Sequence, residues 1–175
     1  YNTIRPDLAD KNHHNTTVNW KESEIKPKDI LKLISIFQMT YMGAPMIYYG
    51  DEAGMWGATD PYCRKPMLWD EIKYEDETNG TLHSKKEKYE VKRDNELFEW
   101  YKKIVKIRKE NQALSRGHFR EVLADNERDI IAYERFNETD YILVVINNSE
   151  KAAEKIKLYI NEKSIKMADL ITGKE

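Results

Sequence analysis

Hydrophobic residues at helical spacing predict a helix that begins near Pro27 and ends at Gly43. Proline suits the first turn of a helix, where its missing N–H costs nothing, and glycine is favoured just beyond a helix end. The apolar stripe consists of Ile30, Leu33, Ile34, Phe37 and Tyr41. Further apolar residues widen this stripe, so we expect the helix to be buried on more than one side.

A second amphipathic helix is predicted after Asp94, whose side chain can cap the helix N-terminus. Its apolar stripe consists of Leu97, Trp100, Tyr101, Ile104 and Ile107. Between the two helices, residues 44–49 (APMIYY) form a short apolar run, which is typical of a strand buried on both faces of a parallel sheet. Residues 50–95 are rich in Asp, Glu, Lys, Gly and Pro. A connection this long in a compact domain is usually functional or disordered.

The chain changes character after Gly117. Short runs of branched and aromatic residues follow, and clusters of turn-forming residues separate the first three of them. The predicted strands are 119–123, 130–136, 141–146 and 156–160, with a weaker candidate at 164–171. This pattern indicates an antiparallel all-β module.

The predicted fold class is α+β, with one domain over residues 1–114 and a second, all-β domain over 115–175. A single parallel strand cannot satisfy its backbone groups alone, so the helix–strand–helix order of the first domain needs neighbouring strands. Residues 1–26 are polar and irregular, and the first residue is Tyr1 rather than Met. We therefore interpret the chain as a processed or excised fragment of something larger.

Composition and charge exclude several classes of protein. The chain has 175 residues, of which 40% are hydrophobic and 34% charged, and a formal net charge of −2. These values favour a globular protein and give no reason to expect nucleic acid or an anionic membrane as a partner. Cys63 is the single cysteine, so no internal disulfide can form. No apolar run is long enough to span a bilayer.

The densest cluster of chemically informative residues is GAPMIYYGDEAGMWGATDPYCRKPMLW, residues 43–69. This segment closely resembles the region around the last barrel strand of α-amylase-superfamily enzymes, glycoside hydrolase family 13. The nearest relatives are of the neopullulanase, cyclomaltodextrinase and α-amylase type. The resemblance is dense over 37–70, looser through the second helix, and only architectural in the β module.

The resemblance implies the last helix–strand–helix portion of a (β/α)8 TIM barrel, followed by an antiparallel all-β C-terminal sandwich domain. Relatives would continue with further strands after residue 175, so we expect this sandwich to be clipped as well. In such a barrel the active site lies at the C-terminal ends of the strands. Residues 50–95 would then form a long sugar-binding loop.

Five residues are predicted to bind substrate. In related enzymes an Asp and an Arg at the spacing of Asp60 and Arg64 hold glucose units on the non-reducing side of the cleaved bond. Tyr49, Trp56 and Trp69 could supply aromatic faces for the sugar rings. The alternative is structural: the two tryptophans could anchor the loop, and Asp60 could pin it through an ion pair with Arg64.

No catalytic residue is expected in this chain. Retaining glycosidases need two carboxyl groups about 5 Å apart across the scissile bond, whereas the neighbouring side chains of Asp51 and Glu52 should point apart. Glu52 is better explained as a structural acceptor at the strand end. By resemblance, the catalytic carboxylates come from earlier barrel strands. Calcium is common in the superfamily, but the sequence identifies no metal site and no cofactor here.

The leading hypothesis is therefore part of a retaining hydrolase of α-1,4-glucosidic bonds in starch-derived oligosaccharides or cyclodextrins, inactive alone. Its partners would be an α-glucan oligosaccharide and the remaining barrel of the parent enzyme. Two alternatives stay open: a non-catalytic α-glucan-binding module, and an inert remnant that self-associates through exposed strand edges. The sequence leaves the compartment open between cytoplasmic and periplasmic or secreted.

Overall fold

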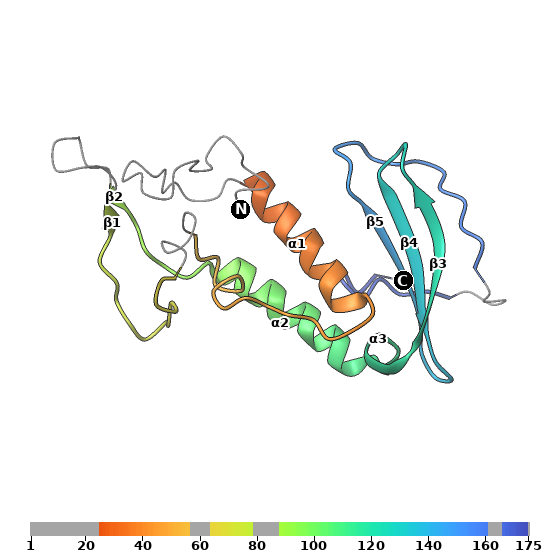
Figure 1. Ribbon diagram of the computed structural model, residues 1–175, viewed down its shortest axis with the longest axis horizontal. Coiled ribbons are helices and arrows are strands. Elements are labelled where there is room, and N and C mark those ends of the chain that lie inside the picture. The colour runs from red at the N-terminus through yellow and green to blue at the C-terminus, as the bar shows by residue number, and fades with distance from the viewer. Residues whose placement is uncertain (1–24, 57–63, 79–87, 161–165, 175) are drawn as a thin grey trace. The chain divides into compact units, whose positions relative to one another are not determined.

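A computed structural model describes residues 25–56, 64–78, 88–160 and 166–174 (Figure 1). The elements in chain order are α1 (Ile25–Thr40), β1 (Glu77–Thr78), β2 (Lys88–Tyr89), α2 (Asn95–Glu110), α3 (Gln112–Arg116), β3 (His118–Asp125), β4 (Ile130–Phe136) and β5 (Tyr141–Asn147). The chain divides into two compact units. The first comprises Tyr1–Lys32 and Ile47–Trp100, and the second comprises Leu33–Met46 and Tyr101–Glu175.

Both predicted helices are present, and α2 begins as its N-cap predicts. The Leu97 backbone N–H donates to Asp94 Oδ1 at 3.0 Å, which satisfies one of the orphan donors of the first helical turn. Lys28 Nζ lies 2.7 Å from Asp94 Oδ2. Desolvation alone would raise the pKa of Asp94, but the hydrogen bonds from Lys28 and the Leu97 backbone outweigh it and hold the pKa below its usual range.

The β module contains an antiparallel sheet in the order β3-β4-β5. Its turns form where the polar clusters predict them. Between β3 and β4, Asp125 Oδ1 accepts hydrogen bonds from the backbone N–H groups of Glu127 and Arg128. Between β4 and β5, Asn137 Oδ1 accepts from the Thr139 and Asp140 N–H groups at 2.9 and 2.6 Å. Asn and Asp side chains make such bonds readily, which is why they favour turns.

The core of the second unit joins one face of this sheet to the C-terminal half of α1. Tyr133, Val144 and Ile146 are buried at its centre. The residues packed against them are Leu33, Ile36, Tyr41, Phe119, Ile131 and Ile142. The Tyr133 hydroxyl lies 2.6 Å from Thr40 Oγ1, so this buried phenol has a polar partner. Each large side chain buried here stabilises the unit by about 1.5–3 kcal/mol.

Two charged side chains of β4 are also buried, and each is satisfied differently. Glu134 is fully buried and accepts from Arg120 Nε and Nη2 at 2.5 and 2.6 Å, and from the Tyr141 hydroxyl. Arg135 is 2% exposed. Its guanidinium donates to the carbonyls of Thr40, Gly117 and His118 at 2.7, 3.2 and 3.3 Å. Burial lowers the pKa of Arg135, and the nearby charge of Arg108 adds to that effect.

The C-terminal end of α1 is held by a second arginine from within the same unit. Arg108 donates from Nη1 to the Met39 carbonyl at 2.6 Å and from Nη2 to the Gly43 carbonyl at 2.8 Å. The last carbonyls of a helix have no intrahelical donor. A cation at this end also interacts favourably with the helix dipole. Arg108 and Arg135 together therefore close a helix end that has no basic residue of its own in its last turn.

Three strand predictions differ from the structure. Residues 44–48 and 156–160 are irregular, so the strands predicted at 44–49 and 156–160 are wrong for this structure. The weaker candidate at 164–171 has no strand over its described residues, 166–171. A strand needs a neighbour to accept its hydrogen bonds. Residues 156–160 are not paired with the sheet described here, and the second layer of a sandwich is not present among the described residues. The boundary between residues 114 and 115 stays a prediction.

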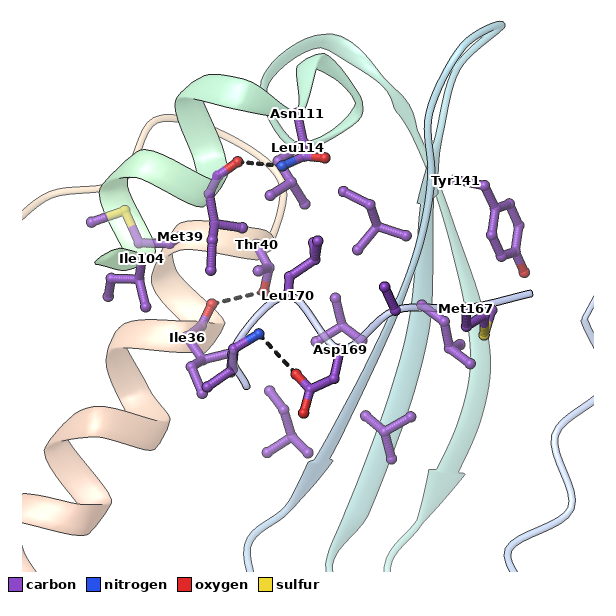
Figure 2. A pocket seen from close by; sticks show the side chains of 18 of the residues that line it. Ile36, Met39, Thr40, Ile104, Asn111, Leu114, Tyr141, Met167, Asp169 and Leu170 are labelled. Atoms are coloured by element: carbon purple, nitrogen blue, oxygen red, sulfur yellow. Dashed lines mark hydrogen bonds between the residues drawn. The ribbon is translucent and has the colours of Figure 1, made fainter. Parts of the chain in front are cut away.

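An apolar groove of about 880 Å³ runs beside the edge strand β5 in the second unit (Figure 2). Consecutive residues from Tyr141 to Ile146 line one wall. The facing walls come from α1, α2, α3 and residues 166–171, with Met39, Ile104 and Leu170 among them. Asn111 turns its amide away to donate to the Ile107 carbonyl at 2.7 Å.

Candidate functional site

Tyr49, in the first unit, is hydrogen-bonded to a residue that lies later in the 43–69 motif. Its hydroxyl donates to the Lys65 carbonyl at 2.9 Å. Tyr49 is 43% exposed and Tyr48 is 50% exposed, and their ring centroids lie 5.0 Å apart. Tyr49 is thus held to the backbone through its hydroxyl and still lies at the surface.

A tight turn follows Tyr49 and depends on two glycines with positive φ. Gly50 has φ +95° and Gly54 has φ +67°, conformations that side chains disfavour. A Cβ at Gly50 would lie 2.6 Å from Met55 Sδ. The Met55 and Ala53 N–H groups both donate to the Gly50 carbonyl, and Ala53 is completely buried. The turn is therefore a compact, internally bonded unit.

Glu52 is a structural acceptor, as predicted from the sequence. Its Oε2 accepts a hydrogen bond from the Gly50 N–H at 2.9 Å, which holds the carboxylate against its own turn. Asp51 remains exposed at the surface. Desolvation by the surrounding protein and the neighbouring charge of Glu52 raise the pKa of Asp51.

Trp56 is partly covered by a lysine that sequence reasoning missed. The Lys65 ammonium lies 4.1 Å from the centroid of the Trp56 ring, a distance at which a cation is attracted to the aromatic face. The two residues line a small pocket of about 180 Å³ together with Leu68, Tyr74 and Val91. One face of Trp56 thus already has a partner, and no sequence pattern signals which lysine provides it.

Trp69 is the most exposed of the predicted aromatic sugar platforms. This residue is 57% exposed, whereas the preceding Leu68 is 8% exposed. Leu68 is therefore part of the buried core, and Trp69 lies at the surface. Trp69 therefore has the aromatic surface that stacking on a sugar ring would require.

Of the remaining two predicted substrate-binding residues, Asp60 and Arg64, the structure describes only one. Arg64 is described and exposed, but Asp60 lies outside the described residues. The structure therefore places Tyr49, Trp56, Arg64 and Trp69 in one unit with Asp60 not described.

The described residues contain neither a metal-ligating cluster nor a membrane-spanning helix. No group of three or more His, Cys, Asp or Glu side chains that could hold a metal ion occurs over 25–56, 64–78, 88–160 and 166–174. Within the same ranges, no helix has the length and apolarity needed to cross a membrane.

Comparison with known proteins supplies the family. The α-amylase catalytic domain matches residues 8–117, which is more than half of the chain. Neopullulanase 2 from Thermoactinomyces vulgaris is 37% identical over 145 residues, covering 82% of this chain and 21% of the relative. A cyclomaltodextrinase from Geobacillus thermopakistaniensis is 35% identical over 143 residues, again covering 82% of this chain and 21% of the relative. The chain thus spans about a fifth of the length of these curated relatives.

A solved structure agrees with the sequence relatives. A cyclomaltodextrinase superposes with a TM-score of 0.56 at 38% identity, covering 71% of this chain and 18% of that one. The matched residues 8–117 include the whole 43–69 motif and the predicted sugar-binding residues within it. The chain therefore belongs to the α-amylase family, glycoside hydrolase family 13.

Proposed function

We propose that this chain supplies substrate-binding residues and barrel wall to a longer retaining glycoside hydrolase. Its substrates would be starch-derived oligosaccharides or cyclodextrins joined by α-1,4-glucosidic bonds. The observation that carries the proposal is the family match over residues 8–117, which includes the exposed aromatic side chains of Tyr49 and Trp69. The names of the relatives, neopullulanase and cyclomaltodextrinase, support this substrate class.

Each proposed role follows from the chemistry of the side chain. Tyr49 and Trp69 would stack on the apolar faces of glucose rings, and Trp56 would contribute aromatic surface beside Lys65. Asp60 accepts and Arg64 donates hydrogen bonds in planar pairs, which suits vicinal sugar hydroxyls. These contacts would hold the glucose units on the non-reducing side of the scissile bond.

The chain alone is proposed to be inactive. Retaining hydrolysis requires a carboxylate nucleophile and a carboxylic acid about 5 Å apart. Glu52 is engaged by the Gly50 N–H, and neighbouring Asp51 cannot supply the opposite side of a bound sugar. The catalytic carboxylates would come from earlier strands of the whole protein.

The proposal is tested first with the 175-residue chain and then with the whole protein. Incubation of the chain with maltoheptaose or a cyclodextrin should give no cleavage products by chromatography. In the whole protein, Asp60→Ala or Arg64→Ala should each lower kcat/KM for maltoheptaose by about tenfold to a hundredfold, since each removes hydrogen bonds from a charged group. Arg116→Ala, at the exposed end of α3, is the matched control.

Two results would contradict the proposal. Reproducible cleavage by the chain alone would place the catalytic carboxylates within these 175 residues. Unchanged turnover in both whole-protein variants would remove Asp60 and Arg64 from the substrate site. A non-catalytic α-glucan-binding module would instead show maltoheptaose affinity in the chain alone, although a loop outside its barrel lacks the preorganisation that makes weak polar contacts effective.

Self-association is a second candidate role, favoured by the edge strand β5. Its sequence, YILVVIN, carries no charge or proline, the devices that usually protect an edge from pairing. Val145 is 44% exposed. We propose that two copies of the isolated chain pair along β5. Sedimentation should then show a dimer that Val145→Lys reduces, whereas a concentration-independent monomer would exclude it.

A further inference from the structure

A single tyrosine side chain closes the short loop that carries Trp69. The Tyr74 hydroxyl donates to the Met67 carbonyl at 2.9 Å and accepts a hydrogen bond from the Trp69 backbone N–H at 2.8 Å. A phenol can do both at once, because its oxygen carries one proton and acceptor lone pairs. The Ile72 N–H also donates to the Trp69 carbonyl at 3.2 Å. Both backbone polar groups of Trp69 are therefore engaged within residues 67–74.

The same loop is anchored on either side of Trp69, which is itself exposed. Leu68 is 8% exposed. Asp70 forms an ion pair with Arg93. Arg93 in turn lies 4.2 Å from the Phe98 ring centroid and donates from Nε to Asn95 Oδ1 at 2.9 Å. The loop is thus tied to the start of α2 while Trp69 stays 57% exposed.

We propose that Tyr74 is a positioning residue that fixes the Trp69 backbone and so presents the exposed indole face to an α-glucan. The inference rests on the proposed function and extends it to a residue outside the predicted site. Stacking on a sugar requires the ring plane to be held at a defined orientation. A loop ordered before binding loses less conformational entropy when the sugar arrives. Tyr74 supplies that order with two hydrogen bonds from one oxygen atom.

The first test needs no sugar. Tyr74→Phe keeps the ring and removes only the hydroxyl, so the Trp69 amide loses its acceptor. Hydrogen exchange of that amide, followed by NMR in the 175-residue chain, should become about threefold to tenfold faster, as expected for the loss of one such bond. Tyr159→Phe is the control, since Tyr159 is 81% exposed. Unchanged exchange at Trp69 in the Tyr74 variant would overturn the proposal.

The second test asks whether this order serves binding. In the whole protein, Tyr74→Phe should raise KM for maltoheptaose by about threefold to tenfold. The value of kcat should change little, because the interaction acts equally on bound substrate and transition state. Tyr159→Phe should leave both constants unchanged. An unchanged KM would overturn the role of Tyr74 in presenting Trp69. If the unaltered whole protein hydrolysed no α-glucan, the proposed function would fail, and the exchange experiment would still decide whether Tyr74 holds Trp69.

Discussion

The ion pair between Arg120 and Glu134 allows the stability of the β module to be tested quantitatively. The two residues face each other across β3 and β4 in the register. Arg120 approaches both carboxylate oxygens, at 2.5 and 2.6 Å. The Glu134 side chain is 1% exposed and that of Arg120 is 33% exposed. Replacing Arg120 by Met therefore removes both guanidinium hydrogen bonds from a buried carboxylate that also accepts from the Tyr141 hydroxyl.

The expected cost follows from that burial. Removing one partner of a fully buried ion pair costs about 3–5 kcal/mol. Arg120 is one-third exposed, and solvent screening reduces the value to about 2–4 kcal/mol. The matched control is Arg128→Met, which breaks the ion pair to Asp125 in the same hairpin, with side chains 47% and 16% exposed. A pair this exposed contributes little to stability, because solvent screens it.

Native-state hydrogen exchange of the β4 amides measures the relevant free energy of unfolding. We expect the Arg120 variant to lose at least about 1 kcal/mol more than the Arg128 variant. The double variant Arg120→Met/Glu134→Met should recover much of the loss, because apolar replacement of a buried pair is often close to neutral. If the two single variants agreed within about 0.5 kcal/mol, the assignment of Glu134 as a buried charge dependent on Arg120 would be refuted.

Two further predictions concern the first unit. Asp94→Ala should destabilise α2 by about 1–2 kcal/mol through loss of the cap and the Lys28 ion pair. Because the folded pKa of Asp94 is lowered, its stabilising effect is complete above about pH 4 and is lost as the pH falls through the folded pKa. The Asp94→Ala variant should not show this acid-induced loss in urea titrations at different pH values, and an equal loss in both proteins would contradict the assignment. In thermal unfolding, Gly54→Ala should lower the stability more than Gly173→Ala does. Both glycines have positive φ, but a Cβ at Gly54 would lie 2.6 Å from Asp94 Cβ, whereas a Cβ at Gly173 would meet open space. Equal costs would exclude the steric contact with Asp94.

Local patterns in the sequence were sufficient for the elements whose signals are local. The apolar stripes and the Asp94 cap place α1 and α2, and the predicted strand 130–136 coincides with β4. The Asp125 and Asn137 clusters place both turns of the sheet, because their side chains bond to backbone only two or three residues away. The family is also determined by sequence alone, through a motif whose residues are contiguous along the chain.

The candidate site was predictable only in part. The sequence indicates which aromatic and polar residues of the 43–69 motif are suited to sugar binding, but not which surfaces they expose. Lys65 lies on the Trp56 ring and Tyr74 holds Trp69, although neither lysine nor tyrosine at those positions has a distinctive pattern. Such contacts depend on how a loop closes on itself, and a loop has no periodicity that would indicate its neighbours.

Only the tertiary structure shows which apolar runs form strands and which partners the buried charged residues of β4 have. The apolar runs at 44–49 and 156–160 have the composition of strands, but strand formation requires hydrogen-bonding partners from elsewhere in the chain. Glu134 and Arg135 interrupt an otherwise apolar β4, and the sequence does not reveal that one meets Arg120 and Tyr141 while the other binds three backbone carbonyls. Helices, caps and turns are determined by neighbours in sequence, whereas edge strands and buried charges are determined by the groups that folding brings to them.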